Sequence, residues 1–146
     1  MTVQDVYDAA IKLMNEQRDA SGETMTPDTV DYKNRCIDIL NSLIVKAFPY
    51  SDTFYDGYDT LGENKKPTAP RVSAFTDTIG LDESISAILC YGLAARLEEK
   101  DDPAFARDMM AEFDEQLVLL ARSTPTVSEP IADLYGGNEW GQFSRW

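Results

Sequence analysis

A cluster of acidic side chains between residues 98 and 115 is the part of this sequence best suited to chemistry. All-α nucleotide pyrophosphohydrolases bind Mg²⁺ through carboxylates at helical spacing, and Asp108 and Glu112 have the i, i+4 spacing that places them on one helix face. A clean Glu-x-x-Glu facing a Glu-x-x-Asp is missing, and the acids fall opposite an apolar stripe. We therefore expect a solvated face, with a channel-lining surface or a metal site as the alternatives. The acids of this cluster are Glu98, Glu99, Asp101, Asp102, Asp108, Glu112, Asp114 and Glu115.

Other catalytic chemistry finds little support in the sequence. The chain contains no histidine, which excludes Ser–His–Asp and Cys–His catalysis and most transition-metal sites. No phosphate-binding glycine loop, nucleophile elbow or CxxC motif is present, and the serines and threonines have no evident base. Cys36 and Cys90 lie on apolar helical faces, which predicts two buried, reduced thiols. We expect no catalytic, cofactor-binding or metal-binding residues and no enzymatic activity.

The charge of the chain limits its partners. Its 146 residues carry a formal charge of −13, and no basic stripe suited to gripping nucleic acid is present. An acidic wall beside DNA would instead repel its phosphates. The pair Lys65 and Lys66 is most simply solvated. No apolar run approaches the roughly 18 residues that span a bilayer, and the start has no signal-peptide pattern, so we expect no membrane association. An acidic DNA mimic or small regulatory protein stays open.

Hydrophobic periodicity predicts four helices. The first spans about Val3 to Arg18, with Thr2 and Asp5 forming a capping box. The second begins at Thr26-Pro27 and is stopped by Pro49. The third is capped by Asp82, and the fourth begins at Asp102-Pro103 and ends near Arg122. The expected core stripes are Val3, Val6, Ala10, Leu13 and Met14; Val30, Ile37, Leu40, Ile44, Ala47 and Phe48; Ile85, Ile88, Leu89, Leu93 and Leu97; and Phe105, Met109, Phe113, Leu117 and Leu120. Gly92 is expected to let another helix approach closely.

Two segments do not follow this pattern. Residues 49–80 are rich in proline and glycine and contain several aromatics, which predicts a long inserted loop or a small hairpin with a turn at Asp56-Gly57. We expect this loop to order against neighbouring subunits. Residues 123–146 cannot form one helix, yet contain both tryptophans of the chain. Such residues dominate interface hot spots, so we expect an extended arm that docks on a partner; folding back over its own core and disorder are the alternatives.

The sequence resembles the head–tail connector, or adaptor, proteins of tailed phages. The likeness is carried by VYDAAIKLMNE, by DYKNRCIDILNSLI, by LDESISAILCYGLAARLEEKDDPAFARDMMAEFDEQL and by YGGNEWGQFSRW. Each motif is weak alone, and the order of the helices followed by an aromatic tail carries most of the resemblance. It covers most of the chain outside the 49–80 loop.

The resemblance implies a structural virion protein made in the host cytoplasm and located at the head–tail interface. It would form a ring, dodecameric by resemblance, that joins the portal protein to tail or stopper and neck proteins, while DNA passes nearby without specific binding. The expected fold is an all-α four-helix domain over residues 1–122, with the 49–80 insertion and a C-terminal arm over 123–146. The expected partner-binding residues are Leu134, Tyr135, Trp140, Phe143, Arg145, Trp146, Phe54, Tyr55 and Tyr58.

Overall fold

The computed structural model describes residues 1–14, 27–54 and 67–123. Its helices are α1 (Val3–Leu13), α2 (Pro27–Ala47), the short 3-10 helix η1 (Phe48–Tyr50), α4 (Glu83–Glu98) and α5 (Pro103–Ser123). Within these three ranges there is no β-strand, and the single β-bridge outside named strands pairs Thr2 with Thr78. The predicted all-α class is confirmed, and the described part of the 49–80 segment contains no hairpin strand.

Helix α1 begins with the predicted capping box. The Thr2 hydroxyl accepts a hydrogen bond from the Asp5 backbone N–H at 3.2 Å, and the Asp5 carboxylate accepts one from the Thr2 backbone N–H at 2.9 Å. These bonds satisfy amide groups that the first turn leaves without partners. The helix ends at Leu13 with Met14 as its C-cap, whereas the predicted end was Arg18, which lies outside the described residues.

The two aspartates before α4 and α5 act differently. Asp102 caps α5, because its carboxylate accepts hydrogen bonds from the backbone N–H groups of Ala104 and Phe105 at 3.1 and 3.0 Å. Asp82 occupies the N-cap position of α4 but makes no side-chain bond to that helix. Its carboxylate instead accepts a hydrogen bond from the Asp52 backbone N–H at 2.9 Å. The predicted helix start is confirmed, whereas the predicted capping role of the Asp82 side chain is wrong.

Helix α2 ends as expected but faces the core differently. Pro49 lies in the first turn of η1, where a missing N–H is tolerated. Val30, predicted in the core, is 55% exposed, and Ile37 is only partly buried. The buried residues of α2 are Tyr32, Cys36, Leu40, Leu43, Ile44 and Ala47. The buried face of α2 therefore includes Tyr32 and Cys36, which the predicted stripe left out.

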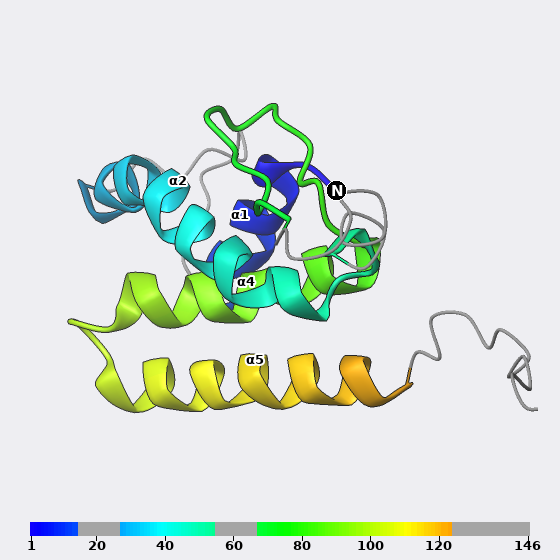
Figure 1. The fold of residues 1–146 in the computed structure, drawn as a ribbon. Coiled ribbons are helices and arrows are strands. Elements are labelled where there is room, and N and C mark those ends of the chain that lie inside the picture. The colour runs from blue at the N-terminus through cyan, green and yellow to red at the C-terminus, as the bar shows by residue number, and fades with distance from the viewer. Residues whose placement is uncertain (15–26, 55–66, 124–146) are drawn as a thin grey trace, which may run out of the picture.

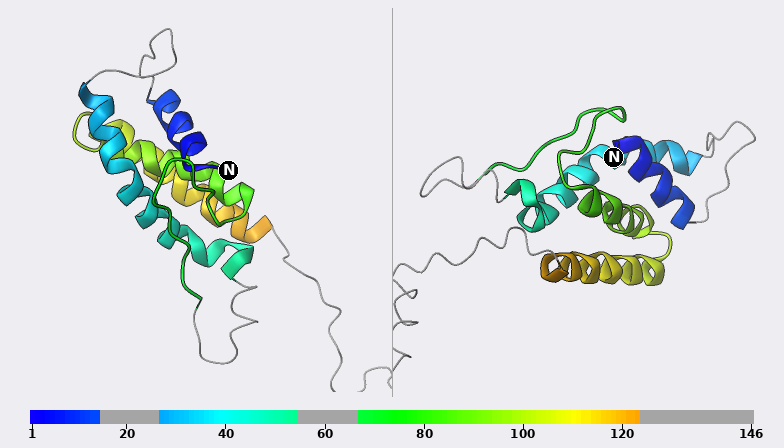
Figure 2. Two further views of the ribbon diagram at one scale, coloured as in Figure 1. Left: turned by 90° about the horizontal axis from the view of Figure 1, so that it is seen from above. Right: turned by 90° about the vertical axis from the view of Figure 1, so that its right-hand side faces the viewer.

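Helix α4 is the centre of the fold. Helices α1 and α2 pack on one side of it and α5 on the other, so that α5 forms a layer of its own (Figure 1, Figure 2). Packing on both sides buries even the polar residue Ser86 along with the predicted stripe Ile85, Ile88, Leu89, Leu93 and Leu97. The core is thus organised around one helix that has almost no exposed face.

Gly92 is the point where three helices meet. A Cβ atom built there would lie 3.0 Å from Leu43 Cδ2 and 3.3 Å from Phe113 Cδ1. The expected close approach is confirmed, and α2 and α5 both contribute the side chains that fill the space. On α5, Met109 and Met110 are both partly buried, and Met110, not the predicted Met109, packs against the core.

Residues 67–82 fold over α1 and belong to the core. The Val3 N–H donates to Asp77 O and the Ile79 N–H donates to Met1 O, both at 3.0 Å. The Phe75 ring packs edge-on against Tyr7 with centroids 5.5 Å apart. Val72, Ile79 and Leu81 are buried. This half of the insertion therefore packs on helices of its own chain, through α1 and through the hydrogen bonds between Val72 and Asn41 of α2. Its expected ordering against neighbouring subunits stays a prediction.

Candidate interaction surface

Most of the predicted partner-binding residues lie outside the described part of the chain: Tyr55, Tyr58, Leu134, Tyr135, Trp140, Phe143, Arg145 and Trp146. The turn at Asp56-Gly57 and the pair Lys65 and Lys66 lie outside it as well. Phe54 is described, and its ring packs edge-on against Phe48 with centroids 5.3 Å apart. It is partly buried and forms part of the packing beneath η1.

The acidic cluster is mostly solvated, as expected, but Glu112 is half-buried and Glu98 is buried. Glu98 is only 9% exposed and accepts a hydrogen bond from the Tyr32 hydroxyl at 3.2 Å. Nearby, Arg35 of α2 donates to the Leu97 carbonyl at 3.3 Å. The prediction that Glu98 faces water is wrong, because α2 crosses the end of α4 there. Glu98 of α4 thus bonds to α2, and Arg35 of α2 bonds to α4, so that two hydrogen bonds join the two helices.

The remaining acids form no metal centre in the described ranges, where no group of three or more possible ligands could hold a metal ion. Asp108 is exposed, and Glu112 accepts a hydrogen bond from the Gln116 side chain at 2.8 Å. Asp114 pairs with Lys46 of α2 at 2.6 Å, and the same ammonium lies 5.4 Å from the centroid of the Phe113 ring. This pair links the C-terminal half of α2 to α5.

Both thiols are buried and free, as predicted. Burial raises the pKa of Cys36 to about 12 and also raises the pKa of Cys90. A thiol needs its thiolate form to act as a nucleophile or a metal ligand. These surroundings favour two inert core residues.

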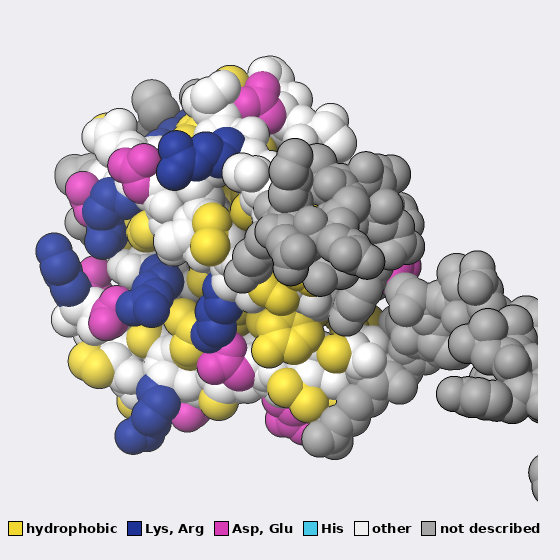
Figure 3. All heavy atoms as spheres, viewed as in Figure 1, with side chains coloured by type: hydrophobic (Ala, Val, Ile, Leu, Met, Phe, Trp, Pro, Cys, Tyr) yellow, Lys and Arg dark blue, Asp and Glu magenta, His cyan; other side chains and the backbone are white. Residues whose placement is uncertain are grey.

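Exposed apolar side chains occur on the outer helix and at the end of α2. Val118 and Leu119 of α5 are 40% and 47% exposed, and Val45 and Tyr50 are exposed near the C-terminus of α2. Figure 3 shows apolar patches interspersed with lysine and arginine side chains on one face of the molecule, although the chain as a whole is acidic. Such a mixed surface is suited to a protein interface.

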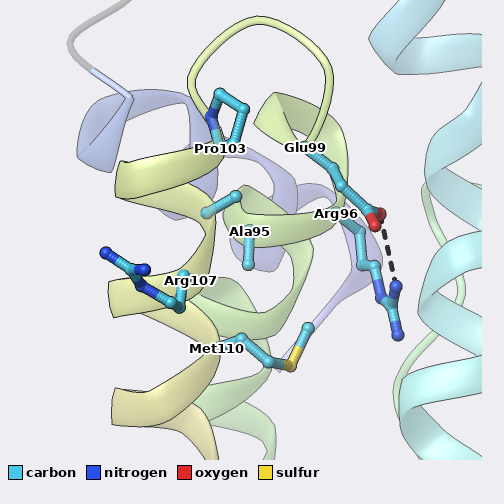
Figure 4. Close-up of a pocket in the computed structure, with 7 residues that line it drawn as sticks. Ala95, Arg96, Glu99, Pro103, Arg107 and Met110 are labelled. Carbon is cyan, nitrogen blue, oxygen red and sulfur yellow. Dashed lines mark hydrogen bonds and ion pairs between the residues drawn. The ribbon is translucent and has the colours of Figure 1, made fainter.

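A groove lies between the C-terminal half of α4 and the N-terminal half of α5 (Figure 4). Its volume is about 380 Å³, within the roughly 300–1,000 Å³ range of binding pockets. The lining residues are Ala95, Arg96, Glu99, Pro103, Ala106, Arg107 and Met110. Small apolar side chains form much of its wall, and charged side chains flank it.

The charges beside the groove are weakly engaged. Arg96 donates to the Glu99 carboxylate at 3.2 Å, and both side chains are at least half exposed. Arg107 is 80% exposed and lies 3.9 Å from Asp108. Surface pairs of this kind contribute roughly 0–1 kcal/mol. Either guanidinium is therefore available to a carboxylate or an aromatic ring of a bound partner at little cost.

Sequence reasoning did not identify this groove. Arg96 and Arg107 are eleven positions apart in the sequence, on two helices, so their proximity depends on how α4 and α5 cross. The one usable signal was the pair of small residues Ala95 and Ala106, which line the groove.

None of the helices within the described ranges is long and apolar enough to cross a membrane. Comparison of the chain with protein-family models, with curated proteins and with solved structures gave no match.

Proposed function

We propose that this protein is a structural adaptor of a tailed phage virion, which self-associates into a ring and joins the portal to the tail. Two kinds of support are independent of each other. The sequence resembles head–tail connectors in the order of its helices and in its aromatic C-terminal pattern. The surface carries exposed apolar side chains on an outer helix.

The one-sided packing of α5 carries the proposal. This helix packs mainly against α4, with a smaller contact to η1, and leaves Val118 and Leu119 exposed. Burying such side chains against a neighbour contributes about 25 cal/mol per Å² of apolar surface. A stable interface needs roughly 800 Å² per partner, and the exposed face of the 21-residue helix α5 would supply part of that area.

The other surfaces fit the same proposal. The net charge of −13 would repel the phosphates of DNA that passes through a ring without binding it. Residues 123–146 supply aromatic anchors for the portal, for tail or neck proteins, or for the neighbouring subunit. Many modest contacts repeated around a ring hold firmly because each raises the effective concentration of the next.

Size-exclusion chromatography with light scattering tests the proposal, on the full chain alone and mixed with its cognate portal protein. We expect an oligomer and co-elution with the portal. A chain that stays monomeric at high concentration and does not co-elute with the portal protein would contradict the proposal.

A nucleotide-hydrolysis assay with Mg²⁺ tests the enzymatic alternative. We expect no turnover in the wild type or in the double variant Asp108→Asn, Glu112→Gln, which should fold normally because Asp108 is exposed and Glu112 bonds only within its own helix in the contacts described above. Turnover by the wild type that the double variant loses would establish a pyrophosphohydrolase instead.

A further inference from the structure

We propose that the groove between α4 and α5 receives the C-terminal segment, residues 124–146, of a second copy of this chain. The inference rests on the proposed function as a ring-forming adaptor, and it names the contact between neighbouring copies. It follows from the chemistry of the groove, the composition of the segment and the distance between them.

The groove offers an apolar wall flanked by two arginines and by Glu99, whose carboxylate pairs with Arg96. Ala95, Ala106 and Met110 provide small or flexible apolar contacts, which suit a planar aromatic side chain. Arg96 and Arg107 extend in different directions at its sides (Figure 4). A guanidinium binds carboxylates in a bidentate manner and stacks on aromatic rings. The preferred occupant is therefore a peptide that has both aromatic rings and acids.

The C-terminal segment has this composition. It contains both tryptophans of the chain together with three acids, Glu129, Asp133 and Glu139, and a single base, Arg145. Tryptophan and tyrosine anchors account for much of the binding energy in protein interfaces. The segment thus complements the groove in both apolar character and charge.

The positions of groove and segment allow the segment to reach the groove of its own copy or that of a neighbour, and the proposed ring selects the neighbour. The groove lies at the first two turns of α5, and the segment follows Ser123 at the opposite end of that helix, about 30 Å away at 1.5 Å per residue. Trp140 lies 17 residues after Ser123, so extended chain could carry it up to about 56 Å. Each copy then has one segment and one separate groove. Head-to-tail pairing of two different surfaces generates a closed ring when the rotation between copies closes.

Photo-cross-linking of the full chain tests the contact directly. Glu99 is replaced by p-benzoylphenylalanine, which keeps both arginines, and unlabelled protein is mixed with ¹⁵N-labelled protein before irradiation. We expect cross-linked peptides from residues 124–146 with mixed isotope masses, which only a contact between copies can produce. Same-chain masses alone would overturn the proposal in favour of a segment folded onto its own groove. An absence of cross-links to this segment would overturn it as well.

Charge reversal provides the second readout. The double variant Arg96→Glu, Arg107→Glu should weaken self-association at least about tenfold, because like charges would face each other across the contact. The control Lys33→Glu, Arg71→Glu makes the same charge change at side chains that do not line the groove. Restoring opposite charges with Glu129→Arg, Asp133→Arg and Glu139→Arg should recover part of the loss. Equal weakening in the groove and control variants would overturn the proposal.

The two hypotheses fail in different ways. A chain that forms rings and binds the portal, but whose cross-links miss residues 124–146, would refute the groove contact and leave the adaptor function standing. A chain that neither self-associates nor binds the portal would refute the adaptor function, and the groove contact with it.

Discussion

Helices α4 and α5 lie side by side but occupy different environments. Helix α4 buries 11 of its 16 residues, since other elements cover both of its sides. Among the described side chains of α5, only Ala106, Phe113 and Leu117 are buried. The comparison separates two roles: α4 and the inner face of α5 hold the fold together, whereas the outer face of α5 is free to contact other molecules. Substitutions at buried positions should therefore lower the free energy of unfolding, whereas substitutions on the outer face of α5 should weaken self-association.

The largest effect is expected where the inner face of α5 meets α4. Phe113 is fully buried, so Phe113→Ala should lower the free energy of unfolding by about 3–5 kcal/mol through lost burial and a cavity. Leu89→Ala on α4 should cost about 2–5 kcal/mol for the same reason. Urea unfolding followed by circular dichroism measures both. Midpoints equal to wild type would mean that these side chains are not in the core.

Overfilling the helix junction should have the next largest effect. Gly92→Val places a branched side chain against Leu43 and Phe113, whose nearest atoms lie within 3.3 Å of where a Cβ atom at this position would be. Overpacking of this kind costs about 1–3 kcal/mol. The control Ala87→Val changes an exposed position of the same helix and should cost less than about 1 kcal/mol. Because valine has a higher helix propensity than glycine, a loss for Gly92→Val no larger than that for Ala87→Val in thermal melts would show that crowding at this junction is not costly.

The link between α2 and α4 predicts a smaller loss. Tyr32→Phe removes the hydroxyl that donates to the buried Glu98, at a cost of about 0.5–1.5 kcal/mol for the loss of one hydrogen bond. Tyr50→Phe is the matched control, because Tyr50 is 41% exposed, and its effect should stay within about 0.5 kcal/mol. Denaturant unfolding compares the two, and similar midpoints would argue against a stabilising bond.

Two hydrogen-bonded carboxylates, the exposed Asp5 and the half-buried Asp77, predict how the free energy of unfolding depends on pH. The Thr2 hydroxyl and backbone lower the pKa of Asp5, and the backbone N–H groups and hydroxyl of the Ser73–Ala74 turn lower the pKa of Asp77. A carboxylate whose pKa is lower in the folded state stabilises that state above the unfolded pKa, near 4. This contribution is lost as pH falls through the folded pKa.

The double variant Asp5→Asn, Asp77→Asn should therefore show a flatter dependence of unfolding free energy on pH below about pH 4. Chemical denaturation at several acidic pH values measures this slope. A slope as steep as that of the wild type would assign the acid sensitivity to other groups.

The smallest effect on stability is expected on the outer face of α5. Leu119→Asp changes a side chain that is 47% exposed, so the free energy of unfolding should change by no more than about 0.5 kcal/mol. Self-association should nevertheless weaken, because a charge would be placed in the proposed interface. Light scattering at matched concentrations checks this. A loss of several kcal/mol in the monomer would show that this face belongs to the core.

Local signals predicted the helices well. The Thr2 and Asp5 capping box and the Asp102-Pro103 start depend on groups within four residues of each other, so the sequence displays them directly. The α4 stripe followed from hydrophobic periodicity, and the close approach at Gly92 followed from the small residues Ala94 and Ala95 beside it. In contrast, the covering of α1 by residues 67–82 depends on a segment more than sixty positions away, whose prolines and aromatics were equally compatible with an open loop.

By itself, the sequence determined that this chain is helical, acidic and without histidine chemistry, because residue types and short-range spacing fix those properties. Tertiary structure decided which residues serve the core and which serve the surface. It turned Val30 outward, buried Glu98 beneath α2, and placed Arg96 and Arg107 on the same groove. The physical reason is that burial depends on what crosses a helix, and the crossing partners lie far away in the sequence.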